Sequence, residues 1–253
     1  MKYPEPLIKA RLIRRYKRFL ADVELLDADN NVIQALTIHT ANTGSMTGCA
    51  IPGSIIWISN SHNPKRKYLY SWELSSAYDA SAYNVSAKGN TLIGINTLLA
   101  NKLVYEAIEQ GYIPELSATQ AIATEVPYGN ERSRIDLLVT QHNGQKCYIE
   151  VKNVTASFEL DVAAFPDAVT TRGTKHLREL ELMVQQGHRA IIFYCVQRED
   201  IHSVRVANEI DPLYAKTLAQ VQEKGVEVLA YGVRFSGNRS PDGIFLTKKL
   251  SFL

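Results

Sequence analysis

Two apolar segments carry residues that together could hold a divalent cation. Asp136 lies among apolar residues 135–139, and Glu150 lies in a second apolar stretch that follows a short polar turn. Two neighbouring carboxylates in an apolar setting stay charged only when a cation offsets their repulsion. Mg²⁺ or Mn²⁺ fits such a site, because these hard cations prefer carboxylate and water oxygens. A cation held there would polarise a phosphoryl oxygen and lower the pKa of a bound water.

Two further residues extend this candidate site. Lys152 follows Glu150 by two positions and could orient the attacking water or neutralise charge on the phosphorus. Glu106 lies in an earlier apolar stretch, where it could supply a third carboxylate or cap the solvent edge of a helix. The alternative for the set is a structural ion-pair network, because an Asp followed by Glu-x-Lys is a loose pattern.

The neighbouring pattern predicts a hairpin that would bring these side chains together. Residues 134–140 and 146–152 are typical of strands, and the His-Asn-Gly segment between them is typical of a tight turn. Side chains two apart on a strand project to the same face, so Glu150 and Lys152 should point together. Antiparallel pairing through the turn would then place Asp136 beside them.

The second half of the chain predicts an α/β (α+β) domain with a mixed sheet. Its expected elements, in order, are a helix at 95–110, strands at 121–126, 134–140 and 146–152, a helix at 174–186, a strand at 190–196, a helix at 211–224 and a strand at 226–231. Two of these helices are followed by glycine, at 111 and 187, which is a C-terminal signal.

The first eighty residues predict short strands instead. The expected strands lie at 23–26, 32–38, 54–58 and 68–74, and residues 14–19 suit either a strand or a helix. Several short strands without a convincing helix indicate a small barrel, and an OB-like barrel is the most economical choice. We therefore expect an OB-like nucleic-acid-binding domain at 1–82 and the α/β domain at 83–253.

Basic residues gather in two places on a chain whose net charge is only +2. The candidate contacts to nucleic-acid phosphates are Arg14, Arg15, Lys17, Arg18, Lys65, Arg66 and Lys67. Local clusters on a near-neutral chain fit a phosphate-binding patch, and the alternative is a solvated charged face. The aromatic residues that could stack on bases or fill the barrel core are Tyr16, Phe19, Trp57, Tyr68, Tyr70 and Trp72.

Other classes of protein are not supported by the sequence. The three cysteines are far apart and form no Cys-x-x-Cys pair, so neither a disulfide framework nor a zinc site is indicated. No apolar run is long enough to cross a bilayer and the N-terminus has no signal-peptide core, which predicts a cytoplasmic protein without a membrane partner. The sequence does not decide the oligomeric state, and a homodimer is compatible with it.

The order of helix, hairpin with Asp then Glu-x-Lys, helix and strand resembles the PD-(D/E)XK superfamily of restriction-endonuclease-like folds. The whole chain more specifically resembles the sugar fermentation stimulation protein A family. The segments that carry this resemblance are RYKRFLADV (15–23), NTGSMTGC (42–49), SRID (133–136), YIEVKNVT (148–155), FPDAVT (165–170), RGTKHL (172–177) and VQR (196–198). Two positions depart from the expected pattern: His39 is followed by Thr-Ala where Cys-Pro is expected, and Asn153 stands where Ser is expected.

The resemblance implies an OB-like domain joined to a nuclease-like domain, DNA binding without strong sequence preference, and a regulatory link to maltose metabolism. It implies Asp136 and Glu150 as metal ligands, Lys152 as the catalytic lysine and Glu106 as the helix carboxylate. A Mg²⁺-dependent deoxyribonuclease and a transcriptional regulator of sugar metabolism with a non-catalytic nuclease fold are both compatible with it. The sequence contains no helix-turn-helix pattern, so it gives the transcriptional-regulator hypothesis no independent support.

One loop has two interpretations. Gly44 and Gly48 free the backbone around short hydrogen-bonding side chains at 42–47, so the loop could present N–H and hydroxyl donors to a phosphate. The alternative is a tight connecting turn.

Overall fold

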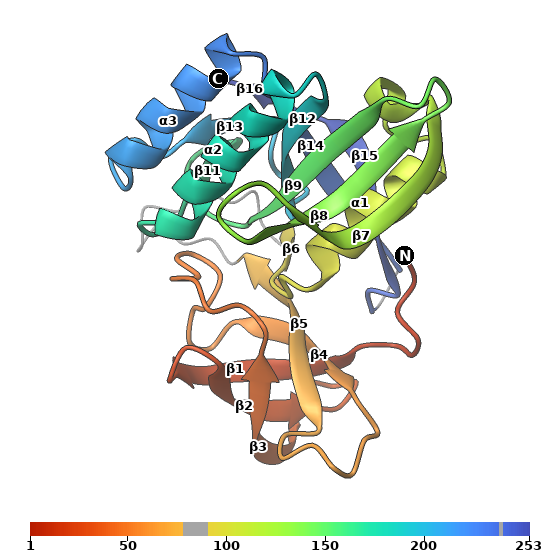
Figure 1. The fold of residues 1–253 in the computed structure, drawn as a ribbon. Helices are drawn as coiled ribbons and strands as arrows, with labels where there is room; N and C mark the ends of the chain where they lie inside the picture. Colours follow the sequence, from red (N-terminus) through yellow and green to blue (C-terminus); the bar gives the residue numbers. More distant parts are fainter. Residues whose placement is uncertain (78–90, 238–239) are drawn as a thin grey trace.

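The computed structural model describes residues 1–77, 91–237 and 240–253, which form two lobes (Figure 1). The N-terminal lobe is built from β1 (Ile8–Tyr16), β2 (Leu20–Leu26), β3 (Val32–Thr40), β4 (Ile55–Asn60), β5 (Tyr70–Ala77) and β6 (Thr91–Gly94). These strands pair in the order β3-β2-β1-β4-β5-β6, and a further β3–β5 pairing closes the barrel. The predicted OB-like barrel is confirmed.

Local sequence explains the barrel's turns and core. The predicted hairpin of β2 and β3 forms because the Asp27 carboxylate accepts hydrogen bonds from the backbone N–H groups of Asp29 and Asn31. The ambiguous segment at 14–19 is a strand up to Tyr16, after which two residues with positive φ make the turn into β2. Alternate side chains fill the core, among them Leu12, Val23, Ile38, Ile56 and Trp72.

The C-terminal lobe contains a mixed sheet in the order β15-β14-β12-β9-β8-β7. Its strands are β7 (Thr119–Tyr128), β8 (Ser133–Gln141), β9 (Lys146–Val154), β12 (Arg189–Val196), β14 (Glu227–Ser236) and β15 (Gly243–Lys249). The hairpin strands β7, β8 and β9 are antiparallel, whereas β9, β12 and β14 are parallel, as the helical crossovers require. The predicted mixed sheet with an antiparallel hairpin is confirmed.

Helices cover both faces of this sheet (Figure 1). On one face α1 (Leu99–Glu109) packs through Leu103 and Val104 against residues such as Phe193 of β12. On the other face α2 (Thr171–Gln185) and α3 (Pro212–Glu223) pack against the alternate side chains of the same strands. Both predicted glycine stops are confirmed, because residues 111 and 187 adopt positive φ directly after α1 and α2.

Some predicted bounds were wrong, and several short elements were missed. The helix expected at 95–110 begins only at Leu99, because Ile95 hydrogen-bonds to Glu73 of β5 and the Asn96 side chain caps the turn that follows. The start of β1, residues 8–13, was not expected from sequence. The whole elements not expected are β6, β10 (Ser157–Glu159), β11 (Val162–Phe165), β13 (Ser203–Val206), β15, β16 (Ser251–Phe252) and the 3₁₀ turn η2 (Pro114–Leu116). Most of these are four residues or shorter, too short to show a period.

The two lobes are joined by contacts between distant parts of the chain. The N-terminal ammonium of Met1 pairs with Glu106, and β6 of the barrel sheet also forms a bridge from Ile93 to Arg198. The predicted division between residues 82 and 83 lies outside the described residues. No helix in the described ranges is both long and apolar enough to span a bilayer.

Candidate active site

The β8–β9 hairpin brings the two predicted carboxylates together. Leu137 pairs with Ile149 in the antiparallel register, so the adjacent positions, Asp136 and Glu150, face each other across the hairpin. The backbone N–H of Val151 donates to Asp136 Oδ2 at 2.8 Å. The predicted turn between these strands is confirmed, with residue 144 at positive φ.

Burial and mutual repulsion shift the pKa of one of these carboxylates strongly. Burial, and then the nearby charge of Glu150, raise the pKa of Asp136 to about 6. The Val151 N–H and the Asn101 side chain oppose this shift. Burial also acts to raise the pKa of Glu150, but Lys152 and His176 outweigh it and the pKa lies below its ordinary value. The two carboxylates therefore titrate differently although they are neighbours.

Glu150 is held by two side chains on the α2 face of the sheet. Lys152 Nζ donates to Glu150 Oε1 at 2.7 Å, and His176 Nδ1 contacts the same oxygen. Because Arg172 Nε donates to His176 Nε2 at 3.3 Å, the hydrogen of the imidazole belongs on Nδ1, which then donates to Glu150. Lys152 and His176 therefore hold Glu150 through Oε1, and Arg172 acts on it only through His176.

The second oxygen of Glu150 has no protein partner. Glu150 Oε2 is buried and accepts no hydrogen bond in the described part of the chain. The hydroxyl of Tyr128 is likewise buried and has no hydrogen-bond partner there. Both groups are electrostatically coupled: burial raises the pKa of Tyr128 above its ordinary value, and the charges of Glu150 and Asp136 add to this effect. A buried carboxylate oxygen without a donor is costly unless a cation or an ordered ligand satisfies it.

This donor set fits a divalent cation. Asp136 and Glu150 supply two carboxylates in a largely apolar hairpin, and one oxygen is left unsatisfied. Across the described residues, no group of three or more His, Cys, Asp or Glu side chains is arranged to hold a metal. Two carboxylates with the remaining positions taken by water and phosphate are the pattern by which Mg²⁺ usually binds.

The structure does not bring Glu106 into this cluster. Its carboxylate pairs with the Met1 ammonium at 2.9 Å and lies near Lys102 of the preceding turn. Asn101 instead reaches the site from α1 and donates from Nδ2 to Asp136 Oδ1 at 2.8 Å. Residues five apart on a helix are about 140° apart around its axis, so Asn101 and Glu106 cannot serve the same face.

The β7–β8 turn that precedes Asp136 is anchored by α2. The buried Glu179 carboxylate accepts from the backbone N–H groups of Asn130 and Glu131. Gly129 in this turn has φ of 67°, and a Cβ there would overlap Glu179 Oε2. Helix α2 therefore sets the position of the strand that carries Asp136 as well as supplying His176.

Four polar residues near the carboxylates were not predicted from sequence: Asn101, Tyr128, Arg172 and His176. One signal was present, since Arg172 and His176 are four apart and share a helix face. Their approach to Glu150 from 22 to 26 positions away depends on how α2 packs on the sheet, which no local pattern encodes.

The predicted basic contacts divide into engaged and unengaged groups. Arg14 pairs with Asp22 at 2.8 Å, and Arg15 donates to the backbone carbonyls of Asn42 and Gly44. In the second cluster Arg66 donates to the Ser71 hydroxyl and Lys67 lies over the Tyr68 ring. Of the seven candidates, Lys17, Arg18 and Lys65 are the ones whose described side chains have no ion pair, hydrogen bond or ring contact, and Lys67 has the ring contact alone.

Of the aromatic candidates, Trp72 is fully buried in the barrel core, whereas Phe19 is 44% exposed beside the Lys17 and Arg18 turn. Phe19 is thus the aromatic side chain best placed to contact a ligand at that turn.

The Asn-Thr-Gly-Ser loop forms a tight turn that joins the lobes. Gly44 N donates to Asn42 Oδ1, while Ser45 donates from both N and Oγ to Asp167 Oδ2. These donors are occupied within the protein, which favours the connecting-turn interpretation over a phosphate contact. Asp167 precedes α2, so the loop fixes the barrel to the helix that bears His176.

The sequence is similar to known proteins along nearly its whole length. Residues 13–83 match the family described as the SfsA N-terminal OB domain, and residues 98–239 match the sugar fermentation stimulation protein RE domain. A sugar fermentation stimulation protein homolog of Thioalkalivibrio sulfidiphilus is 48% identical over 250 residues, which is 99% of this chain and 97% of that protein. A homolog of Saccharophagus degradans is also 48% identical over 250 residues, covering 99% of both.

A solved structure shares the complete two-lobed fold. The structure of SfsA of Pyrococcus furiosus in complex with Ca²⁺ has a TM-score of 0.81 and 25% sequence identity. The match covers 100% of this chain and 98% of that chain. The arrangement of an OB-like barrel followed by a restriction-endonuclease-like mixed sheet is therefore that of a known structure.

Proposed function

The chain belongs to the sugar fermentation stimulation protein family, and we propose that it binds DNA largely without regard to sequence and carries a divalent-metal phosphodiesterase site. In this proposal residues 1–82 form the nucleic-acid-binding domain and residues 83–253 form the nuclease-like domain. The observation that carries the proposal is the unpartnered Glu150 Oε2, buried opposite Asp136. The Ca²⁺ complex of the Pyrococcus furiosus relative supports a divalent cation in this family.

Asp136 and Glu150 would hold the cation, either Mg²⁺ or Mn²⁺. When bound, the cation supplies Lewis-acid polarisation of the scissile phosphate and lowers the pKa of a coordinated water. Asn101 keeps Asp136 Oδ1 oriented, and His176 keeps Glu150 turned so that Oε2 stays available. These contacts restrict both carboxylates to one geometry before any substrate arrives.

Lys152 would stabilise the negative charge that develops on the phosphate oxygens. Its side chain is only 12% exposed, and its ammonium group already lies 2.7 Å from Glu150, so it is placed at the carboxylates without a large side-chain movement. A preorganised cation in a partly dry site stabilises a transition state more than the same cation does in water.

The barrel would supply the phosphate contacts that hold DNA. Lys17, Arg18 and Lys65 have side chains free for this role, and Arg66 and Lys67 lie in the same loop as Lys65. Arg14 and Arg15 are engaged within the lobe and would contribute less. Such contacts read the backbone rather than the bases, so binding should be nearly independent of sequence and steeply dependent on salt.

The test uses purified protein with labelled single-stranded and duplex DNA in Mg²⁺, Mn²⁺, Ca²⁺ or EDTA, with cleavage and gel retardation read from the same samples. Asp136→Asn should abolish metal-dependent cleavage while retardation persists. Glu223→Gln, which removes one charge at the exposed end of α3, is the matched control and should cleave as the wild type does.

Equal cleavage by Asp136→Asn and Glu223→Gln would show that the site lies elsewhere. Retardation of one specific operator without any cleavage would instead support the transcriptional regulator of sugar metabolism.

A further inference from the structure

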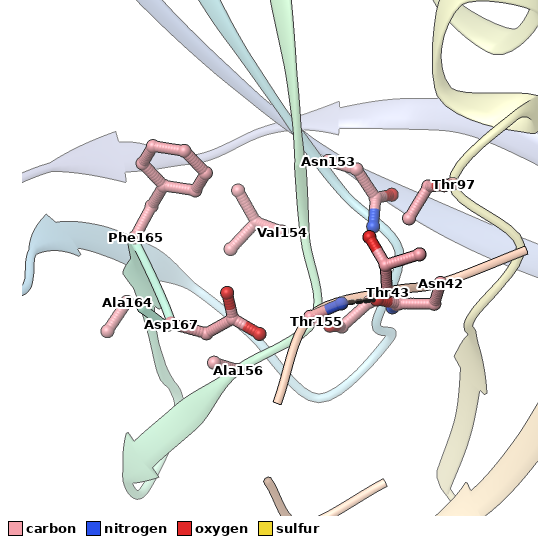
Figure 2. A pocket seen from close by; sticks show the side chains of 11 residues that line it. Asn42, Thr43, Thr97, Asn153, Val154, Thr155, Ala156, Ala164, Phe165 and Asp167 are labelled. Carbon is pink, nitrogen blue, oxygen red and sulfur yellow. Dashed lines mark hydrogen bonds between the residues drawn. The ribbon is translucent and has the colours of Figure 1, made fainter. Parts of the chain in front are cut away.

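A pocket lies where the two lobes meet, close to the candidate active site, and is called the seam pocket below. Figure 2 shows this pocket, whose volume is about 180 Å³. Three parts of the chain line it: the 42–44 loop of the barrel, Thr97 ahead of α1, and residues 153–156 and 164–167 of the C-terminal lobe. Neither the candidate metal ligands nor Lys152 belongs to its lining.

The polar groups of this pocket include both hydrogen-bond donors and an acceptor. Asn153 Oδ1 accepts from Gln197 Nε2, which leaves the Nδ2 group of Asn153 as a donor without a partner in the described chain. Asp167 Oδ2 is held by Ser45, so Oδ1 remains as an acceptor. In Figure 2 the Asp167 carboxylate lies on the side of Phe165, while the Asn153 side chain lies beside Thr97 across the pocket.

The remaining walls are apolar and rigidly supported. The ring of Phe165 packs against those of Tyr194 and Tyr214, with ring centroids 5.5 Å and 5.3 Å apart. Val154 lies on the same side of the view as Phe165. Gln197, which orients Asn153, is fully buried and also donates to Asn96 O. The pocket is therefore shaped before a ligand binds.

The pocket adjoins the hollow in front of Asp136. A larger hollow of about 470 Å³ is lined by Asp136 and Asn101 and also by Thr97, which lines the seam pocket as well. On the other side, Asn153 directly follows Lys152 along β9. This adjacency would allow a DNA strand with a phosphate at the carboxylates to reach the pocket with a neighbouring nucleoside.

We propose that the seam pocket is a subsite for one unpaired nucleobase, a role that rests on the proposed function. A base edge carries N–H donors for Asp167 and carbonyl or ring-nitrogen acceptors for Asn153, while its faces are apolar enough to lie against Phe165 and Val154. A phosphate would be repelled by the Asp167 carboxylate. Because duplex pairing conceals these edges, the pocket accepts a base only from a single strand or after extrusion from a duplex.

The experiment compares two labelled strands of equal length in EDTA, where cutting is suppressed. One strand carries bases, and the other is a tetrahydrofuran abasic strand with the same number of phosphates. Wild-type protein should bind the base-bearing strand about tenfold more tightly by fluorescence anisotropy, as contacts to one base would give.

Asn153→Asp should remove most of this preference, because it keeps the acceptor for Gln197 but replaces the pocket donor with a second carboxylate. Asn143→Asp, the same substitution in the exposed β8–β9 turn, is the control and should keep the preference. Thr155→Val, which removes an uncharged pocket hydroxyl, gives a second test should Asn153→Asp not fold, with an expected loss of about threefold.

Equal binding of both strands by the wild type would overturn the base subsite alone and leave phosphate-directed DNA binding intact. Equal preferences in Asn153→Asp and Asn143→Asp would also overturn it. Failure to bind either strand would overturn the subsite together with the proposed function.

Discussion

Two groups of charged residues, one in each lobe, differ in their surroundings. In the barrel, Arg11 and Arg14 of β1 are paired with Glu24 and Asp22 of β2, at the surface where water already solvates them. In the C-terminal lobe, Glu150 is nearly inaccessible and still has one oxygen without a partner. Surface pairs cost little to form and little to break, whereas a buried unpartnered oxygen is costly. The buried exception is therefore the stronger indicator of function.

In the comparison of buried with surface charges, the largest effect is expected at Lys152. Lys152→Met should lower the cleavage rate by roughly 10²–10³-fold, the usual loss when one preorganised charge-stabilising donor is removed. It should also lower the free energy of unfolding by about 3 kcal/mol, because it removes one partner of a buried ion pair. Urea denaturation and a cleavage time course measure the two effects on one preparation.

Lys224→Met is the control for that comparison. Lys224 pairs with Glu181 at 2.7 Å and is 55% exposed, so its loss should cost less than about 1 kcal/mol and leave cleavage unchanged. Similar losses of stability in the two variants would mean that burial does not distinguish these two ion pairs.

A second prediction concerns the pH dependence of stability. The pKa of Asp136 is raised to about 6, so the folded protein binds this proton more tightly than the unfolded chain does. The resulting stability is complete below the unfolded pKa of about 4 and is lost as the pH rises through about 6. In EDTA this loss should reach about 2 kcal/mol between pH 4 and 7.

Asp136→Asn should remove that part of the pH profile, and added Mg²⁺ should restore stability to the wild type above pH 6. Both are measured by urea denaturation across pH. A wild-type profile that matches the Asp136→Asn profile between pH 4 and 7 would contradict the origin assigned to the shift.

The sequence predicted the parts of this site that depend on local pairing. The short turn at 142–145 sets the register of β8 and β9, so the approach of Asp136 to Glu150 followed from the strand pattern alone. Asn101 and His176 could not be found in this way, because their contacts depend on how α1 and α2 pack on opposite faces of the sheet. Helical periodicity identified those faces but not which polar residue on each would reach a carboxylate.

The same limit applied to the barrel. The basic clusters were visible in sequence, but their partners on β2 and in the 42–45 loop were not. Arg15 shows the consequence, since its guanidinium group holds the loop that contacts Asp167. Charge density along a chain therefore overestimates the charge that is free to bind a ligand.

A third prediction separates free from engaged basic residues. The double substitution Lys17→Ala and Arg18→Ala should reduce the slope of log affinity for duplex DNA against log salt by about 2 and weaken binding about tenfold near 0.1 M salt. The double substitution Arg11→Ala and Arg14→Ala changes the net charge equally and should alter the slope by less than about 0.5. Fluorescence anisotropy at several salt concentrations measures both, and equal slopes would assign the effect to net charge alone.

The smallest expected effect compares two buried tyrosines. Tyr128 Oη has no partner, so Tyr128→Phe should raise the free energy of unfolding by up to about 1 kcal/mol while it slows cleavage at the neighbouring carboxylates. Tyr194 Oη lies 2.9 Å from Tyr214 Oη, so Tyr194→Phe leaves Tyr214 unpartnered and should lower stability by about 1 kcal/mol. Opposite signs for the same chemical change would show that the candidate active site keeps an unsatisfied group at a cost in stability, as expected where function rather than folding selects the residue. A loss of stability in both variants, with cleavage unchanged in Tyr128→Phe, would make Tyr128 an ordinary core residue.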